Sequence, residues 1–107
     1  MSYLHLRAAD GHELAAYLVK PEGAARGAVV VIQEVFGVNA HVRRVAEKYA
    51  EAGYLAIAPA LFDRQQRDVE LGYDAAGIQT GIGYMMKADP AGVMADVNAA
   101  IDAVAHA

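Results

Sequence analysis

The residues most able to do chemistry lie in one short run, 32–37, which reads Ile-Gln-Glu-Val-Phe-Gly. The run follows the apolar stretch 28–31 and precedes Asn39, a residue type favoured at helix N-caps. Glu34 therefore stands where a buried strand is expected to end and a loop to begin. Ligands of open α/β sheets bind at the carboxyl ends of the strands. We therefore expect a ligand site at Glu34.

Patterns on the N-terminal side predict a hairpin and a central strand. Strands are expected over 3–8 and 13–19, joined by the turn signal Asp10-Gly11. The β-branched run 28–33 is typical of a central strand that is covered on both faces.

A helix over 39–52 and a strand over 54–58 are predicted next. The helix has one apolar stripe, and Gly53 is placed to terminate it. Residues 28–58 therefore form one β-α-β unit, whose strands should run parallel.

The rest of the chain is less regular in sequence. Residues 61–72 are polar, and 74–87 have helical spacing that is interrupted by Gly77, Gly81 and Gly83. Glycine weakens a helix by about 1 kcal/mol relative to alanine, so we expect a mobile or irregular segment there. Asp89-Pro90 predicts the start of a final helix over about 90–106. The apolar face of that helix is expected to contain Val93, Val97, Ile101 and Val104.

Composition excludes several classes of protein. The 107 residues suffice for one domain, 1–107, and carry a net charge of −4, which disfavours nucleic acid as a partner. The chain has no cysteine, so it has no disulfide or thiolate metal site, and we expect no metal or cofactor. The N-terminal residues do not have the pattern expected of a signal peptide, and no apolar stretch approaches the length expected to span a bilayer. A cytoplasmic protein without membrane contact is the default expectation.

Several segments together resemble the dienelactone hydrolase family, which has the α/β-hydrolase fold. The matching segments are 33–39 (Gln-Glu-Val-Phe-Gly-Val-Asn), Gly53-Tyr54, Pro59, 70–74, 95–97 and 99–101. The resemblance implies an α/β fold with a partial α/β-hydrolase sheet, made of an N-terminal hairpin, a parallel β-α-β unit and a C-terminal helix. It covers only the N-terminal half of the family, so we expect the chain to be truncated before the nucleophile-elbow strand.

The resemblance also implies roles for particular residues. Glu34 matches the family glutamate that contacts the nucleophilic cysteine, and the backbone N–H of Val35 matches one of two oxyanion-hole donors. The candidates for substrate contact are Phe36, Arg67 and Tyr84. The family's arginines that hold a substrate carboxylate cannot be assigned. The chain has no cysteine, Ser2 is its only serine, and it contains no nucleophile-elbow motif.

Two functions follow as hypotheses. The first is the N-terminal portion of an ester or lactone hydrolase, which supplies Glu34 and one oxyanion amide and is inactive alone. The alternative is a non-catalytic module of the same fold that binds a small molecule or a partner. An unpaired edge along strand 28–33 would recruit another strand. We therefore expect self-association or binding of a complementary chain at that edge.

Overall fold

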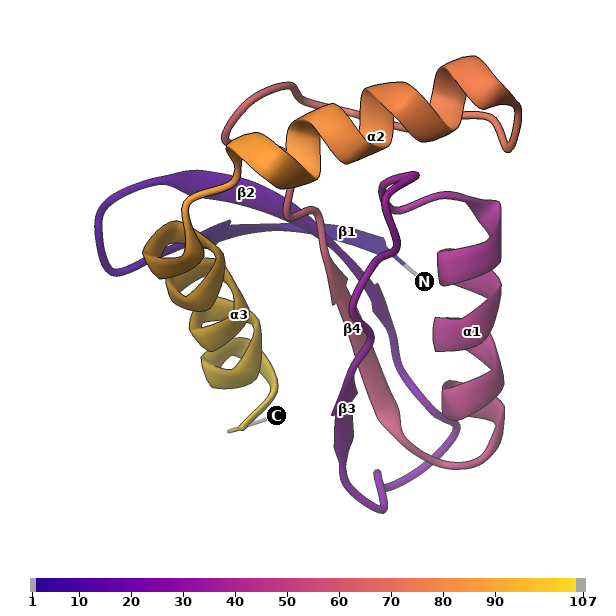
Figure 1. The fold of residues 1–107 in the computed structure, drawn as a ribbon. Coiled ribbons are helices and arrows are strands. Elements are labelled where there is room, and N and C mark those ends of the chain that lie inside the picture. Colours follow the sequence, from indigo (N-terminus) through magenta and orange to yellow (C-terminus); the bar gives the residue numbers. More distant parts are fainter. Residues whose placement is uncertain (1, 106–107) are drawn as a thin grey trace.

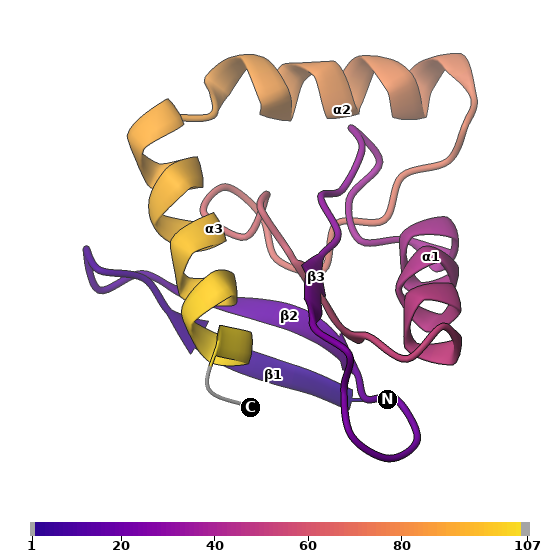
Figure 2. The same cartoon turned by 90° about the horizontal axis from the view of Figure 1, so that it is seen from below.

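The computed structural model describes residues 2–105 and folds them into one mixed sheet with helices on both faces (Figure 1). In chain order the elements are β1 Ser2–Arg7, β2 Glu13–Val19, β3 Ala28–Val30, α1 Ala40–Glu51, β4 Leu55–Pro59, α2 Ala75–Lys87 and α3 Pro90–Ala105. Helix α1 covers one face of the sheet, α3 covers the other, and α2 lies across the end of the sheet (Figure 2). The predicted α/β class is confirmed.

The sheet has the strand order β1-β2-β4-β3. Strands β1 and β2 form an antiparallel hairpin with Leu6 opposite Leu14, and β2 also pairs antiparallel with β4. Strands β3 and β4 run parallel with Val30 opposite Ile57, and α1 connects them. The hairpin and the parallel β-α-β unit are therefore both present as predicted.

Helix α1 begins and ends where its sequence indicates. The Asn39 side chain accepts a hydrogen bond from the Val42 N–H at 3.0 Å, which satisfies one amide of the first turn. After the helix, Gly53 adopts a φ of +101°, a left-handed conformation that favours glycine. The Tyr17 hydroxyl of β2 donates to the Glu47 carboxylate at 2.7 Å. Burial and this hydrogen bond raise the pKa of Tyr17 to about 12.

Strand β4 is buried on both faces and separates two hydrophobic cores. Its side chains alternate, so that Leu55 and Ile57 pack with α3 while Ala56 and Ala58 pack with α1. The core on the α3 side contains Leu6, Leu14, Ala16, Leu18, Leu55, Ile57, Ala100 and Val104. The core on the α1 side contains Tyr17, Val38, Val42, Ala46, Ala56 and Ala58. Each fully buried large aliphatic side chain contributes about 1.5–3 kcal/mol.

Strand β3 is shorter and less buried than the sequence predicts. Its three residues are exposed or half-buried, and β4 is its only strand neighbour in the described chain. The last rung is formed by the Val31 N–H, which donates to the Ile57 carbonyl oxygen at 2.8 Å. The next rung would need an N–H from Pro59, which proline lacks. The predicted central strand over 28–33 is therefore a short edge strand among the described residues, although Val30 still packs on the α3-side core and Val31 on the α1-side core.

Helix α2 is regular, so the prediction of an irregular segment over 74–87 is also wrong. Close packing explains two of its glycines. A Cβ on Gly77 would lie 1.9 Å from the Gly72 carbonyl oxygen, and a Cβ on Gly81 would lie 2.1 Å from the Val35 carbonyl oxygen. Both glycines are buried. Their cost to the helix is offset by the close contact that they allow.

Helix α3 buries a face that is turned from the one its valines predict: Val104 is buried as predicted, but Val93 and Val97 are only half-buried. The buried residues are Gly92, Asp96, Ala100 and Val104, whereas Ile101 is 44% exposed. The helix is turned because Asp96 faces inward to pair with Arg64. A Cβ on Gly92 would lie 3.1 Å from the Arg64 Nε atom, so glycine makes room for the arginine.

We expect Gly81→Ala to destabilise the chain by about 1–3 kcal/mol, the usual cost of an extra methyl group in a close-packed site. The added Cβ would collide with the Val35 carbonyl oxygen, so the helix or the loop must move. Gly83→Ala is the matched control, because nothing lies within 4 Å of its Cβ position. It should stabilise the helix by up to about 1 kcal/mol. Urea unfolding followed by circular dichroism measures both, and a stabilised Gly81→Ala would contradict the contact.

Candidate active site

Gln33 joins the ends of β3 and β4. Its Oε1 accepts a hydrogen bond from the Leu61 N–H at 2.8 Å, and its Nε2 donates to the Glu34 carbonyl oxygen at 3.1 Å. Leu61 lies just beyond the end of β4. One amide side chain therefore connects the two strand ends at the point where backbone pairing stops.

The turn after Gln33 presents Glu34 and Val35. The Gly37 N–H donates to the Glu34 carbonyl oxygen at 3.2 Å and closes the turn. Gly37 has a φ of +85°, and a Cβ there would lie 2.0 Å from the Val69 carbonyl oxygen, so this position requires glycine. The hydrogen bond that closes the turn is donated by the Gly37 amide, so the Val35 amide takes no part in it.

Phe36 is held by the segment that precedes α2. Its ring meets the Tyr73 ring edge to face, with the centroids 4.3 Å apart. The Tyr73 hydroxyl accepts a hydrogen bond from the Asn39 Nδ2 at 3.0 Å, and the Leu71 N–H donates to the Phe36 carbonyl oxygen at 2.9 Å. The turn is therefore attached both to the start of α1 and to the loop before α2.

Glu34, Val35 and Phe36 line one cleft of about 420 Å³, which we call the Glu34 cleft. The cleft is lined by Gln33, Glu34, Val35, Phe36, Leu61, Phe62, Met85, Ala88 and Val93. These residues come from the segments that follow β3 and β4, from α2 and from α3. The cleft therefore lies where the sequence predicts a ligand site, at the carboxyl ends of the parallel strands.

The other two predicted substrate-contact residues do not line the Glu34 cleft. Tyr84 packs against Phe62, with ring centroids 5.2 Å apart, and so supports one wall of the cleft. Arg67 is bound elsewhere: its Nη1 lies 3.3 Å from the Asp63 Oδ2, and its Nη2 donates to the Glu13 carbonyl oxygen at 2.8 Å. The structure therefore does not bring Arg67 together with the residues of the turn.

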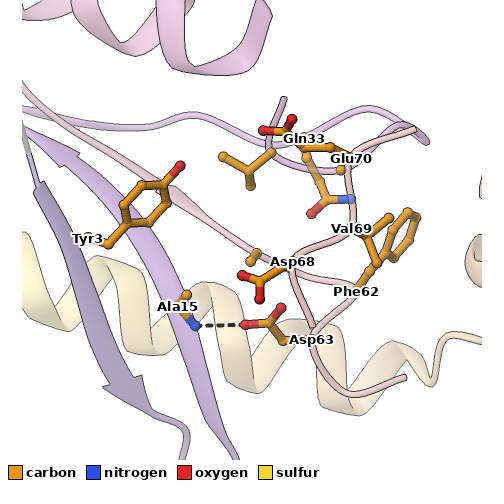
Figure 3. Close-up of a pocket in the computed structure, with 11 residues that line it drawn as sticks. Tyr3, Ala15, Gln33, Phe62, Asp63, Asp68, Val69 and Glu70 are labelled. Atoms are coloured by element: carbon orange, nitrogen blue, oxygen red, sulfur yellow. Dashed lines mark hydrogen bonds between the residues drawn. The ribbon is translucent and has the colours of Figure 1, made fainter. Parts of the chain in front are cut away.

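A second cavity of about 320 Å³ shares Gln33 and Phe62 with the Glu34 cleft (Figure 3). Its charged lining is acidic and consists of Asp63, Asp68 and Glu70. The buried Asp63 accepts a hydrogen bond from the Ala15 N–H at 2.8 Å (Figure 3) and also pairs with Arg67. These bonds connect the hairpin to the loop after β4.

Arg64 is the important residue that the sequence did not reveal. Its Nε and Nη2 donate to the two Asp96 oxygens at 2.9 Å each, and its Nη1 donates to Asp10 at 2.6 Å. The Asp96 carboxylate is fully buried and therefore needs a cation. The hydrogen bond from Arg64 lowers the pKa of Asp10 to about 2, and hydrogen bonds to both carboxylates raise the pKa of Arg64. This ion pair joins the hairpin turn, the loop after β4 and α3.

A second arginine holds the base of the turn. Arg43 of α1 donates to the Val38 carbonyl oxygen at 3.0 Å and pairs with Glu70. The hydrogen bond with Glu70 is the main reason that the pKa of Arg43 is raised. Both loops that build the Glu34 cleft are thus anchored by arginines that lie outside it.

Two other features are absent from residues 2–105. No three side chains of the His, Asp or Glu type come together there in a group that could hold a metal ion. No helix in that span is long and apolar enough to cross a membrane.

The sheet, the turn and the cleft are features of an α/β-hydrolase fold. The chain matches the family model of the dienelactone hydrolase family over residues 14–107 and therefore belongs to that family. A carboxymethylenebutenolidase homologue from Synechocystis sp. is 41% identical over 90 residues, which are 83% of this chain and 37% of the relative. The carboxymethylenebutenolidase of Pseudomonas putida is 36% identical over 62 residues, 58% of this chain and 26% of that protein.

Solved structures show the same similarity. A dienelactone hydrolase homologue from Klebsiella pneumoniae superposes with a TM-score of 0.71 and 29% identity, over 99% of this chain and 45% of that chain. A dienelactone hydrolase-like promiscuous phosphotriesterase from metagenomic libraries gives a TM-score of 0.65 and 28% identity, over 97% and 42%. The family inferred from the sequence is confirmed, and the chain spans less than half the length of these relatives.

We expect Arg64→Met to lower the free energy of unfolding by about 3 kcal/mol, because removing one partner of a buried ion pair leaves the other unpaired. Asp96 would then be buried without its cation. Arg44→Met is the matched control, since Arg44 lies on the exposed side of α1. It should change stability by less than about 0.5 kcal/mol. Urea unfolding at neutral pH measures both variants, and equal effects would contradict the role of Arg64.

Acid provides a second check on Arg64. The folded pKa of Asp10 is about 2 and lies below its ordinary value of 3.8, so its contribution is present above pH 3.8 and is lost as the pH falls through about 2. The stability difference between wild type and Arg64→Met should therefore be constant from about pH 5 to about pH 8 and smaller in strong acid. A difference that persists unchanged in strong acid would show that Arg64 does not hold Asp10.

Proposed function

We propose that these residues are the N-terminal portion of a carboxylic ester or lactone hydrolase. The observation that carries the proposal is the position of Glu34 and Val35, which follow β3 and line the Glu34 cleft. Membership of the dienelactone hydrolase family supports hydrolysis as the reaction. The names of the relatives, carboxymethylenebutenolidases, support a lactone as the substrate class.

In this proposal the Val35 amide stabilises negative charge. When a nucleophile adds to an ester carbonyl, the electron pair of the C=O bond moves to oxygen, and a fixed N–H donor stabilises that oxyanion. One such donor contributes about 3 kcal/mol to the transition state. Glu34, an exposed carboxylate in the same turn, would contact the nucleophile and help to control its ionisation.

The nucleophile and its base would come from outside this chain. Covalent ester hydrolysis needs a nucleophile, a base and a group that orients the base. This chain has no cysteine, and its single serine, Ser2, begins β1 and does not line the Glu34 cleft. We therefore propose that the chain is inactive alone.

The outer edge of β3 is the proposed place for the missing part. The chain contributes no strand to that edge within residues 2–105, and Ile32 beside it is 54% exposed. Unpaired backbone groups on an exposed apolar edge favour addition of another strand. That strand would come from the segment that carries the nucleophile or from a second copy of this chain.

A non-catalytic binding module is the second candidate function. The apolar lining of the Glu34 cleft favours it, because such a cleft holds a small molecule without any chemistry. The two candidates differ in what a supplied nucleophile would do. Only the hydrolase would then turn over an ester.

We expect the 107-residue chain to hydrolyse p-nitrophenyl esters no faster than buffer. Mixing it with the C-terminal remainder of the Synechocystis relative, which would supply nucleophile and base, should restore turnover. Glu34→Ala should lower the restored rate by about 100-fold, the scale of a lost proton-transfer group. Glu22→Ala, in an exposed loop, is the matched control and should not change it.

Two outcomes would each contradict one part of the proposal, the first its claim that the chain is inactive alone and the second its claim of hydrolysis. Turnover by the chain alone that Glu34→Ala abolishes would show a complete site without an added nucleophile. A complex of the two parts that binds esters without hydrolysing them would favour the binding module.

Self-association through the outer edge of β3 can be tested separately. The chain alone should associate with itself at high concentration, and Val30→Pro should reduce that association, because the Val30 N–H points away from β4 and proline removes this edge donor. Light scattering over a concentration series measures the mass. A monomer at every concentration would contradict recruitment of a strand by this edge.

A further inference from the structure

We infer that the Glu34 cleft accepts an uncharged, apolar part of its ligand and disfavours a carboxylate. This inference rests on the proposed function, because it names the substrate class of the same site. It begins from the lining: apart from Gln33 and Glu34, every side chain that lines the cleft is apolar. The lining contains no lysine, arginine or histidine.

The two polar residues of the lining do not favour an anion. The Gln33 side chain is occupied at both ends, since its Oε1 accepts from Leu61 and its Nε2 donates to the Glu34 carbonyl oxygen. Glu34 is then the one charged group of the lining, and its carboxylate repels a second carboxylate. The net charge of −4 adds to this repulsion.

The two arginines that follow Phe62 in the sequence already pair with residues outside the cleft. Arg64 is paired with Asp10 and Asp96, and Arg67 is bonded to Asp63 and to the Glu13 carbonyl oxygen. The family's arginines that hold a substrate carboxylate cannot be assigned in this sequence, and Arg67 is the one arginine that was expected to contact a substrate. Its position removes that possibility for the walls that this chain builds.

The free energy of moving a ligand group from water into the cleft determines which ligand the cleft prefers. A carboxylate that enters an apolar cleft loses its hydration and gains no cation in return. An aryl or alkyl group loses only unfavourable contact with water and packs against Phe36 and Phe62. The class of substrate is therefore an ester or lactone whose portion in this cleft carries no carboxylate.

Phenyl acetate and 4-acetoxybenzoate are a matched pair of probes, because they differ only in one carboxylate. Each is titrated into the full 107-residue chain while the backbone amide signals are followed by NMR. Phenyl acetate should shift the signals of Val35, Phe62 and Met85, which surround the cleft. The carboxylate probe should bind at least about tenfold more weakly.

Two arginine variants separate the local effect from total charge. Met85→Arg places a cation on the wall of the cleft and should tighten binding of 4-acetoxybenzoate at least about tenfold. Met86→Arg is the matched control, since Met86 is 78% exposed and lies outside the lining. It adds the same charge and should change the affinity by less than about twofold.

The outcomes distinguish failure of the inference from failure of the proposed function. If 4-acetoxybenzoate binds in the cleft as tightly as phenyl acetate, the inference is overturned and the hydrolase proposal stands. If neither probe shifts the cleft signals, the inference is overturned, and the hydrolase proposal is decided separately by turnover in the mixture with the C-terminal part. If Met85→Arg does not fold, the comparison of the two probes on the wild-type chain decides alone.

Discussion

The ion pair between Arg64 and the buried Asp96 is the interaction on which the rest of the structure depends. Asp96 lies in α3 against the sheet, and a carboxylate there is tolerated only with a cation beside it. The same arginine reaches Asp10 in the hairpin turn. It therefore holds a loop that has no regular secondary structure of its own. That loop begins with Leu61 and Phe62, so the walls of the Glu34 cleft are positioned from a point outside the cleft.

The features that the sequence predicted correctly are local ones. The hairpin, the Asn39 cap and the strand over 54–58 depend on residues close together in the chain, and the turn at Glu34 depends on a glycine three positions later. The features that it predicted wrongly depend on distant partners. The length of β3 is limited by Pro59 on a neighbouring strand. The glycines of α2 have a purpose only when the loops they contact are in place.

The candidate site also contains features that depend on neighbouring residues and features that depend on distant partners. Glu34, Val35 and Phe36 are consecutive, so their shared place on one wall follows from a single turn. Arg67 and Arg64 lie in a polar segment whose folding is decided by contacts up to 54 positions away, and sequence spacing cannot choose between them. The sequence did contain one signal of the buried ion pair. Asp96 stands four residues from Gly92 and from Ala100, and small residues on either side of an acid indicate a buried carboxylate on a helix.

Gln33 and Phe62 each line two cavities, the Glu34 cleft and the acidic cavity beside it. Residues that couple through a shared wall show interaction energies rather than additive effects. A change of side-chain volume at Phe62 alters both spaces together, and a change at Gln33 also releases the end of β4. The order in which this cleft can adapt to a new ligand is therefore constrained. Substitutions at Met85 or Val93 affect the Glu34 cleft alone and can be accepted first. Substitutions at Gln33 or Phe62 also change the acidic cavity and need compensating changes there.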